Sequence, residues 1–402
     1  MHVHIVEGGG CSMKKTSMLI ILSAILLCIY TVSFAEGSVI TEASDVKVVF
    51  DGKAAMYGNV PIIANDRILL PLRDILGSLG VSNEDIDKTW NGNDQSITVK
   101  HQITKNGKAV PVKINLKVDR NAAFVDDSPV LLDTAPVMYN DRVYIPARFI
   151  SQSLGKKVVW EASTSTVIIR DESEFNRVRE ILQKSRTAAN AAATMSMDTE
   201  ISADISQFGR TFALLLDGRG EMNKTVKLFH MEIKPVSAPN DMSSEMYLAN
   251  GVKYSKDPFS GKWEKKALTN DMYDNEFENK DISMIVNSDD IFCAGLSVAD
   301  STNPDEIFLK GDIYPNGLMN RLSINIRPIE RYELGKGYAE LILDKKTYLP
   351  KKMYFTAKGN FVSGREKPEL SLKVNVLYGA YNGKQDIVVP DDAVNSAAET
   401  EK

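Results

Sequence analysis

Two stretches of this 402-residue chain, 75 positions apart, carry nearly the same sequence. Residues 65–73 read NDRILLPLR and residues 140–148 read NDRVYIPAR. The same offset persists to a Leu-Gly pair at 79–80 and again at 154–155. Because an internal repeat builds one supersecondary unit twice, this feature constrains the fold of residues 45–171 more than any other.

Each copy predicts the same order of elements. A strand leads into an Asn-Asp turn, since both residues tolerate positive φ, and a second strand ends at a proline that suits the first turn of a helix. A glycine then stands where a left-handed C-cap belongs, and a strand with Trp closes the unit. The first copy has five extra residues around 83–87. The residues that define the repeat are Arg67, Pro71, Arg73, Gly80, Trp90, Arg142, Pro146, Arg148, Gly155 and Trp160.

The two arginines that begin the predicted helices, Arg73 and Arg148, have two interpretations. They could contact an anion or a glycan, or each could pair with a carboxylate or a backbone carbonyl in its own copy. A role that defines the fold recurs in every copy. The repetition therefore favours the structural interpretation.

The paired motif NDR-x-x-x-P-x-R, followed by LG, W and V-x-I, resembles the copper amine oxidase N-terminal domain, also called the stalk domain. The resemblance covers residues 45–171. In that family the domain is a non-catalytic appendage, common in secreted proteins of Gram-positive bacteria and usually taken as a surface or wall-associated module. The resemblance therefore implies mounting at the cell surface, with a cell-wall polymer as a candidate partner.

Copper chemistry does not follow from this resemblance. The family's oxidases need three His ligands and a quinone made from Tyr in an Asn-Tyr-Asp/Glu motif, whereas this chain has no Asn-Tyr dipeptide and only His101 and His230 after residue 35. Both are interpreted as surface or satisfied residues. The sequence also has no Gly-rich phosphate loop, Gly-x-Ser-x-Gly motif or paired metal motif. We expect no enzyme activity, no catalytic residue, no metal and no cofactor.

Residues 1–35 have the pattern of a secretory signal peptide. A short positive region at 13–15 precedes an apolar run at 18–34, and Ser-Phe-Ala at 33–35 places small residues before the cleavage point. An uncleaved signal anchor is the alternative, because the apolar run nearly spans a bilayer. Residues 1–12 precede the positive region, so translation is expected to begin at Met13. The protein is expected to be secreted or held on the outer cell surface.

Charge and cysteine content narrow the class further. Lys+Arg 48 against Asp+Glu 53 gives a net charge of -5, which argues against a nucleic-acid partner. Three Cys exclude a disulfide scaffold, and Cys293 is expected to be buried and inert. Leu27 stands where a lipobox needs a small residue before Cys28, so no lipid anchor is predicted.

From residue 195 the hydrophobic pattern takes a period of two. Residues 195–206 alternate between apolar and polar side chains, as is typical of a half-buried antiparallel strand. An Asn-Gly turn at 250–251 predicts a hairpin, whereas residues 270–300 lose the alternation and predict helices and loops. Residues 172–194 predict a helix whose apolar stripe must cover something.

The expected fold class is therefore α+β. A small N-terminal tandem-repeat α+β stalk domain precedes a curved antiparallel half-barrel sheet that helices cover. The half-barrel would span residues 195–392, and a disordered tail would follow at 393–402.

Two phrases near the C-terminus, LDKKTYLPKKM at 343–353 and YNGKQDIVVP at 381–390, look like the LolA/LppX-like lipoprotein-carrier fold. That resemblance implies a half-barrel around a helix-lidded apolar cavity that holds lipid, and it makes the apolar sheet face a candidate site for a lipid or another apolar ligand. The candidate ligand-binding residues are Met197, Ile201, Leu214, Leu216, Phe229, Met231 and Phe355. Core packing is the alternative for each Met among them.

Two functional hypotheses remain. One is a secreted or cell-surface binding protein, in which the repeat domain mounts a half-barrel that binds an apolar or amphipathic ligand. The other is a structural or adhesive cell-wall protein with filled cores and no small-molecule ligand. The alternating strands favour the first, and the tandem repeat favours the second.

Overall fold

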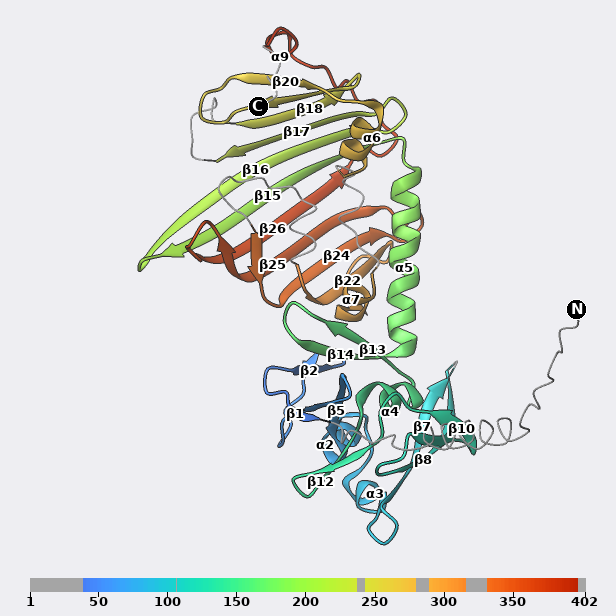
Figure 1. Cartoon of the computed structure of the whole chain (residues 1–402). Coiled ribbons are helices and arrows are strands. Elements are labelled where there is room, and N and C mark those ends of the chain that lie inside the picture. Colours follow the sequence, from blue (N-terminus) through green and yellow to red (C-terminus); the bar gives the residue numbers. More distant parts are fainter. Residues whose placement is uncertain (1–38, 106, 237–242, 280–288, 316–330, 397–402) are drawn as a thin grey trace, which may run out of the picture.

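The computed structural model describes residues 39–105, 107–236, 243–279, 289–315 and 331–396. They form two parts (Figure 1): small sheets with short helices up to residue 171, and one large curled sheet with helices beside it from residue 172. This is the predicted α+β class with a curved antiparallel sheet. The predicted signal peptide and residues 397–402 lie outside the described residues.

The two matching segments meet in a five-stranded sheet, in the order β1-β4-β5-β12-β11. Central strands β5 and β12 pair antiparallel, with Leu70 opposite Ile145. The Asn-Asp turns at 65–66 and 140–141 hold positive φ, 51° and 58° in the first and 47° and 58° in the second, as two-residue hairpin turns require. The strands are β1 (Ile40–Glu42), β4 (Ile62–Ala64), β5 (Arg67–Pro71), β11 (Val137–Tyr139) and β12 (Arg142–Pro146).

A short helix follows each central strand. α2 (Leu72–Ser78) and α4 (Ala147–Ser153) each begin directly after a proline, whose fixed φ suits a helix entry. The chain leaves them through Gly80 and Gly155, with φ of 87° and 73°. The extra residues of the first segment form α3 (Asn83–Asp87). The two segments thus share an element order, while the repeat itself stays a prediction from the sequence.

Two more sheets complete the first part, in the orders β10-β9-β8-β7-β6 and β13-β14-β2-β3. Together with α2 and α4 they enclose one apolar core that contains Leu70, Ile97 and Ile150. Their strands are β2 (Lys47–Phe50), β3 (Lys53–Ala54), β6 (Trp90–Asn91), β7 (Ser96–Lys105), β8 (Lys108–Lys117), β9 (Ala122–Val125), β10 (Ser128–Leu131), β13 (Lys156–Glu161) and β14 (Thr166–Asp171).

The second part is built on a 12-stranded sheet in the order β20-β19-β18-β17-β16-β15-β26-β25-β24-β22-β21, with β23 paired to β25. Its early and late strands meet where β15 pairs with β26. The strands are β15 (Thr194–Gln207), β16 (Arg210–Asn223), β17 (Leu228–Pro235), β18 (Ser244–Ala249), β19 (Val252–Lys256), β20 (Trp263–Ala267), β21 (Leu296–Ala299), β22 (Glu306–Ile313), β23 (Arg331–Leu334), β24 (Gly337–Asp344), β25 (Pro350–Val362) and β26 (Glu369–Gly379).

Helix α5 (Glu172–Ala191) packs against this sheet (Figure 1). Its buried side chains Phe175, Val178 and Leu182 lie in the same core as the apolar residues of the strands. The helix predicted at 172–194 therefore covers the sheet, as its apolar stripe indicated. Two shorter helices, α6 (Asn270–Asn279) and α7 (Asp290–Gly295), contribute Tyr273 and Phe292 to the same core.

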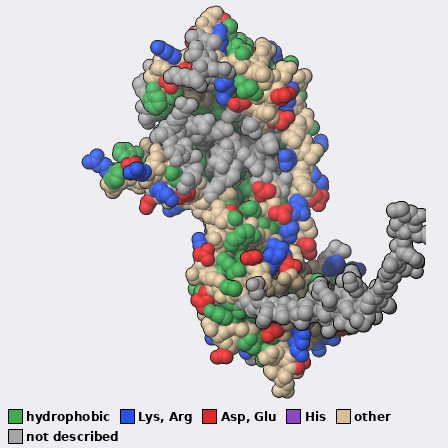
Figure 2. All heavy atoms as spheres, viewed as in Figure 1, with side chains coloured by type: hydrophobic (Ala, Val, Ile, Leu, Met, Phe, Trp, Pro, Cys, Tyr) green, Lys and Arg blue, Asp and Glu red, His purple; other side chains and the backbone are tan. Residues whose placement is uncertain are grey.

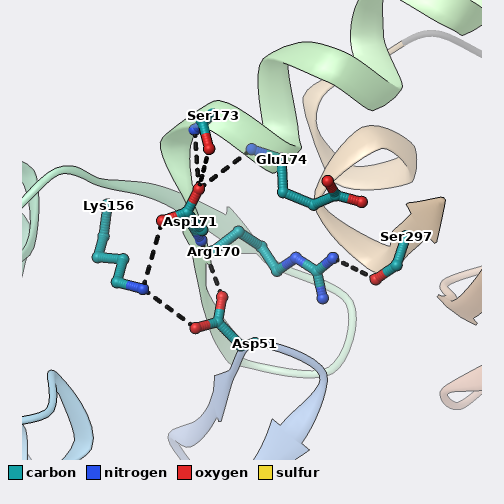
Figure 3. Close-up of polar contacts among 7 residues, drawn as sticks. All are labelled: Asp51, Lys156, Arg170, Asp171, Ser173, Glu174 and Ser297. Atoms are coloured by element: carbon teal, nitrogen blue, oxygen red, sulfur yellow. Dashed lines mark hydrogen bonds and ion pairs between the residues drawn. The ribbon is translucent and has the colours of Figure 1, made fainter. Parts of the chain in front are cut away.

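The two parts join without a linker, because β14 ends at Asp171 and α5 begins at Glu172 (Figure 3). The Asp171 carboxylate caps the helix by accepting hydrogen bonds from the backbone N–H groups of Ser173 and Glu174, at 3.0 and 3.1 Å. The buried Arg170 donates to the Leu296 carbonyl oxygen at 2.8 Å. Strand, helix cap and sheet are thereby fastened at one junction.

The C-terminal tail corrects one expectation. Disorder was predicted from residue 393, yet α9 (Asp391–Val394) is helical and Ala393 is fully buried. The helix packs beside Tyr247 and Trp263, and the Trp263 indole donates to Asp392 at 3.1 Å. A small buried side chain and an acidic partner for the indole order this segment, which the polar composition of the tail concealed. No helix in the described part of the chain is long and apolar enough to cross a membrane.

Candidate apolar binding face

The seven candidate ligand-binding residues lie on one face of the large sheet, the face that α5 covers. Ile201 stands opposite Leu216 on one side and Val374 on the other, and Phe355 stands opposite Val374. Directly opposite residues of an antiparallel pair project to the same face, and so do alternate residues of one strand. The inner face, as we call it, therefore carries Met197, Ile201, Leu214, Leu216, Phe229, Met231 and Phe355.

The seven residues differ in how far they are buried. Phe229 and Phe355 are fully buried at 0% exposure and belong to the packed core. Met197, Ile201 and Leu216 are also buried, whereas Leu214 and Met231 are only partly so. Core packing thus accounts for the two phenylalanines and for Met197, Ile201 and Leu216, whereas Leu214 and Met231 pack at the edge of this core.

A small cavity opens on the inner face where β15, β16, β17 and β26 lie side by side. Its volume is about 30 Å³, enough for about one water molecule. The described residues that line it are Met197, Thr199, Ile201, Gly218, Arg219, Met231, Ile233 and Val374. Three of the seven candidates therefore line the cavity.

Two glycines of β16 give the inner face this room, and the sequence analysis did not single them out. A Cβ added at Gly220 would come within 3.0 Å of the Met197 Cε, so this glycine accommodates the thioether. A Cβ at Gly218 would meet only ordinary contacts, the nearest at 3.5 Å. The spacing Gly-Arg-Gly inside an alternating strand was the available signal, because an interior glycine often marks a close approach.

The cavity contains one polar atom without a partner. The hydroxyl oxygen of Thr199 is buried, and no hydrogen bond reaches it from the described residues. An unmet hydroxyl costs about 1–3 kcal/mol. A water molecule that bonded to it would remove that cost, and the volume of the cavity is enough for one.

The inner face also continues beyond the cavity into solvent. Along β16, Leu216 is buried, Leu214 is partly buried and Phe212 is 59% exposed. The β15–β16 hairpin extends away from the body of the protein (Figure 1), and at its turn Phe208 is 87% exposed. The apolar face therefore runs from the core to Ile205 and the exposed Phe212, and the polar pair of Gln207 and Arg210 separates it from the turn.

The remaining titratable candidates are engaged elsewhere. His230 lies between two carboxylates, with its ring nitrogens 3.4 Å from Glu221 and 3.1 Å from Glu245, so it is a satisfied residue as predicted. Burial lowers the pKa of His101, with a further contribution from the charge of Lys156. Cys293 is buried, and burial raises the pKa of its thiol to about 12, which suppresses the reactive thiolate.

The signature residues of the first part have mixed roles. Pro71 and Pro146 precede the helices, as predicted. Arg67 pairs with Asp133 at 2.9 Å, outside its own hairpin. Arg148 is exposed, and within the described ranges no carboxylate or carbonyl pairs with its guanidinium. The structural interpretation of Arg148, pairing inside its own copy, is therefore wrong for the described residues.

Comparison with known families agrees with the motif of the first part. A family model of the copper amine oxidase N-terminal domain matches residues 49–169, inside the predicted 45–171. A model of a family of unknown function, DUF6612, matches residues 329–398. No curated protein matches the chain.

Several solved structures are similar to the second part. The lipoprotein LppX of Mycobacterium tuberculosis matches with a TM-score of 0.32 and 9% identity, over 53% of this chain and 99% of that one. LprF of Mycobacterium bovis matches at 0.27 and 11%, over 54% and 98%. A LolA superfamily protein of Nitrosomonas europaea matches at 0.19 and 11%, over 53% and 95%. These include the superfamily named from the C-terminal phrases. These TM-scores are low, and the fold of the second part follows from its own strand pairing.

Proposed function

We propose that this protein is a secreted or cell-surface, non-catalytic binding protein whose inner face holds a lipid or another apolar ligand. The leader pattern of residues 1–35 supports export. The observation that carries the proposal is the apolar face that leads from the cavity along β15 and β16 to the exposed Phe212. Exposed aromatic side chains in continuity with a partly buried apolar surface mark an interaction site.

The chemistry of the face favours an elongated apolar molecule. Leu216, Leu214 and Phe212 follow one another on alternate positions of β16, and Ile201 and Ile205 run beside them on β15. An acyl chain laid along these residues would remove apolar surface from water, worth about 0.8 kcal/mol for each buried CH₂ group. The hydroxyl of Thr199 could meet a polar group of the same ligand.

A structural or adhesive wall protein is the second candidate. It is favoured by the complete burial of Phe229 and Phe355, which fill the centre of the inner face with protein atoms. In that case the inner face is only a core, and the first part alone would carry the function. The two candidates differ in whether the purified protein contains lipid.

The decisive experiment is native mass spectrometry of the protein secreted from a Gram-positive host, with lipid analysis of its organic extract. Two neighbouring leucines of β16 provide a matched pair, because Leu214 lies on the inner face and Leu215 is exposed on the opposite face. We expect stoichiometric lipid in the wild type, a loss of about tenfold in Leu214→Gln, and an unchanged content in Leu215→Gln.

A second variant guards against misfolding of the first. Gly218→Ala adds one methyl group where the backbone has ordinary clearance, so it narrows the cavity without forcing a neighbouring strand aside. Lipid content should fall in this variant while the unfolding temperature is preserved. An empty wild type that also takes up no lipid from vesicles would instead identify a structural wall protein.

A further inference from the structure

A groove of about 730 Å³ opens on the first part of the molecule, where the hairpin turn of one matching segment meets the helix of the other. The first segment contributes Asp66 and Arg67, and the second contributes Arg148, Phe149 and Trp160. Its volume lies within the range of about 300–1,000 Å³ that is usual for small-ligand sites. The inner-face proposal makes no use of this groove.

The register of the central strands explains why these residues gather. Leu70 stands opposite Ile145, its counterpart 75 positions later, and Leu69 and Pro71 stand opposite Pro146 and Tyr144. Because the end of each central strand lies beside the start of the other, the turn of each segment lies beside the helix entry of the other, as in a two-fold symmetric interface.

A second, smaller groove of about 240 Å³ forms from the counterpart residues. It is lined by Arg142 from the second segment and by Arg73 and Trp90 from the first. The two grooves are not equivalent, because Asp74 stands in the small groove at the position that Phe149 occupies in the large one. Trp90 is also more buried than Trp160. Substitutions in the small groove therefore provide matched controls for substitutions in the large one.

The large groove exposes apolar surface. Trp160 is 42% exposed and Leu131, from β10, is 76% exposed, and both line the groove. In the view of Figure 2 the first part carries hydrophobic side chains interspersed with acidic and basic ones. An indole that is accessible on one side offers a flat apolar platform with a polar edge.

Beside this platform the groove carries polar side chains that nothing engages. Asp45, Asp66, Arg148 and Gln152 are exposed, and across the described ranges none of their side chains has a hydrogen-bond or ion-pair partner. Carboxylates supply only acceptors, the guanidinium supplies only donors, and the amide supplies both. The groove therefore offers both kinds of group within one small volume.

We propose that the large groove binds a saccharide. A sugar ring would stack its C–H face on the Trp160 indole, and its hydroxyls, which both donate and accept, would bond to Asp66, Arg148 and Gln152. An acyl chain would leave these polar groups unmet, which disfavours lipid here. A sugar chain matches both the apolar platform and the mixed polar rim.

The test titrates the secreted protein with N-acetylglucosamine tetramer and, separately, with soluble glycan strands from peptidoglycan, by calorimetry. Trp160→Ala should weaken saccharide binding by about tenfold or more, and Arg148→Ala should weaken it by a few-fold, on the usual scale of aromatic and charged contacts. Trp90→Ala, in the small groove, should leave the affinity within about twofold of the wild type.

Several results would overturn the proposal. One is that neither of the two saccharides binds at millimolar concentration. Another is that the Trp160→Ala and wild-type proteins bind saccharide with equal affinity. Binding of short wall peptides in place of glycan, lost in Arg148→Ala, would reassign the groove to a peptide. Because Arg148 is exposed, its variant keeps the test valid if Trp160→Ala fails to fold. Lipid content measured on the same variants should not change, which separates this groove from the inner face.

Discussion

The inner face of the large sheet and the large groove of the first part are built in opposite ways. On the inner face the candidate residues are apolar, mostly buried and supplied by alternate positions of long strands. In the groove the proposed contact residues Asp66, Arg148, Gln152 and Trp160 are exposed and chemically mixed, and they come from parts of the chain that lie far apart in sequence. The inner face is mostly buried in the core of the second part, whereas the groove retains exposed polar side chains without partners among the described residues.

Side chains that serve folding and side chains that could serve only binding are therefore easier to separate in the groove than on the inner face. A buried apolar side chain stabilises the core whether or not a ligand binds, so its presence alone is weak support for a site. The Trp160 indole contributes less to the core, because 42% of its surface is exposed to water. Substitutions that affect stability in one region and binding in the other should therefore sharpen the comparison.

The largest expected effect is at the closed centre of the inner face. Phe229→Ala or Phe355→Ala removes a fully buried ring and should lower the free energy of unfolding by about 3–5 kcal/mol. Trp160→Ala, at an exposed position, should lower it by only about 0.5 kcal/mol. Urea titration of the three variants measures these losses in the free energy of unfolding. An equal loss in all three variants would mean that Trp160 contributes as much to folding as the buried phenylalanines of the sheet do.

The next effect concerns whether the two regions unfold together. Arg170→Ala removes the guanidinium that bonds the Ser297 hydroxyl at 2.6 Å (Figure 3) and the Leu296 carbonyl at 2.8 Å. A buried carbonyl without its partner should cost about 2 kcal/mol, and calorimetry should then resolve two transitions instead of one.

Arg177→Ala is the matched control for the junction. Arg177 lies on α5 close to Arg170 in sequence, but its pair with Glu174 is exposed and long, at 3.8 Å. Exposed pairs of this kind contribute about 0–1 kcal/mol. A single transition in both variants would show that the helix alone, without Arg170, couples the two parts.

The sequence predicted the local elements of both regions well. Alternation placed Met197, Ile201 and Leu216 on a common face, and the Asn-Asp turns and helix-starting prolines indicated the hairpins and helices of the first part. These features depend on neighbours along the chain, which a single sequence displays. The tail at residues 393–396 was missed because its order depends on contacts with Tyr247 and Trp263, far away in sequence.

The groove could not be predicted for the same reason. Arg148 and Trp160 were both recognised as repeated residues, but their proximity to Arg67 follows from the pairing of β5 with β12. A repeat can place its copies side by side in several registers, and the sequence does not select among them. The Arg148 side chain, expected to pair inside its own copy, instead faces a groove shared by both.

A smaller effect is expected at the cap of α5. Burial acts to raise the pKa of Asp171, but hydrogen bonds from Ser173 and Glu174 and the charge of Lys156 outweigh it and leave the pKa below its ordinary value. A carboxylate with a lowered pKa stabilises the fold at pH values above its ordinary pKa of about 4. That stabilisation is lost as the pH falls through the pKa of the folded state.

Asp171→Ala should therefore lower the free energy of unfolding by about 1 kcal/mol at pH 7. The difference from the wild type should shrink as the solution is acidified below about pH 4. Denaturant titrations at pH 7 and at acid pH measure this. Asp45→Ala, at an exposed carboxylate of the groove, is the control and should leave the free energy of unfolding at pH 7 within about 0.5 kcal/mol of the wild type.

The smallest effect on stability, and the sharpest test of the comparison, lies at the exposed end of the inner face. Phe212 continues the apolar row of Leu216 and Leu214 but is 59% exposed, so Phe212→Ala should change the free energy of unfolding by at most about 0.5 kcal/mol. If a ligand enters along this row, the variant should nevertheless take up lipid from vesicles several times more slowly, because the entering chain loses an aromatic contact.

Phe259 provides the control for this last prediction, because it is a phenylalanine that is also exposed, at 86%, in the turn between β19 and β20 and away from the row. Phe259→Ala should leave both stability and uptake unchanged. If the two variants behave alike, the exposed end of the inner face is not an entrance. A selective loss in Phe212→Ala would instead show that this end resembles the groove, since binding would then depend on a side chain that folding does not require.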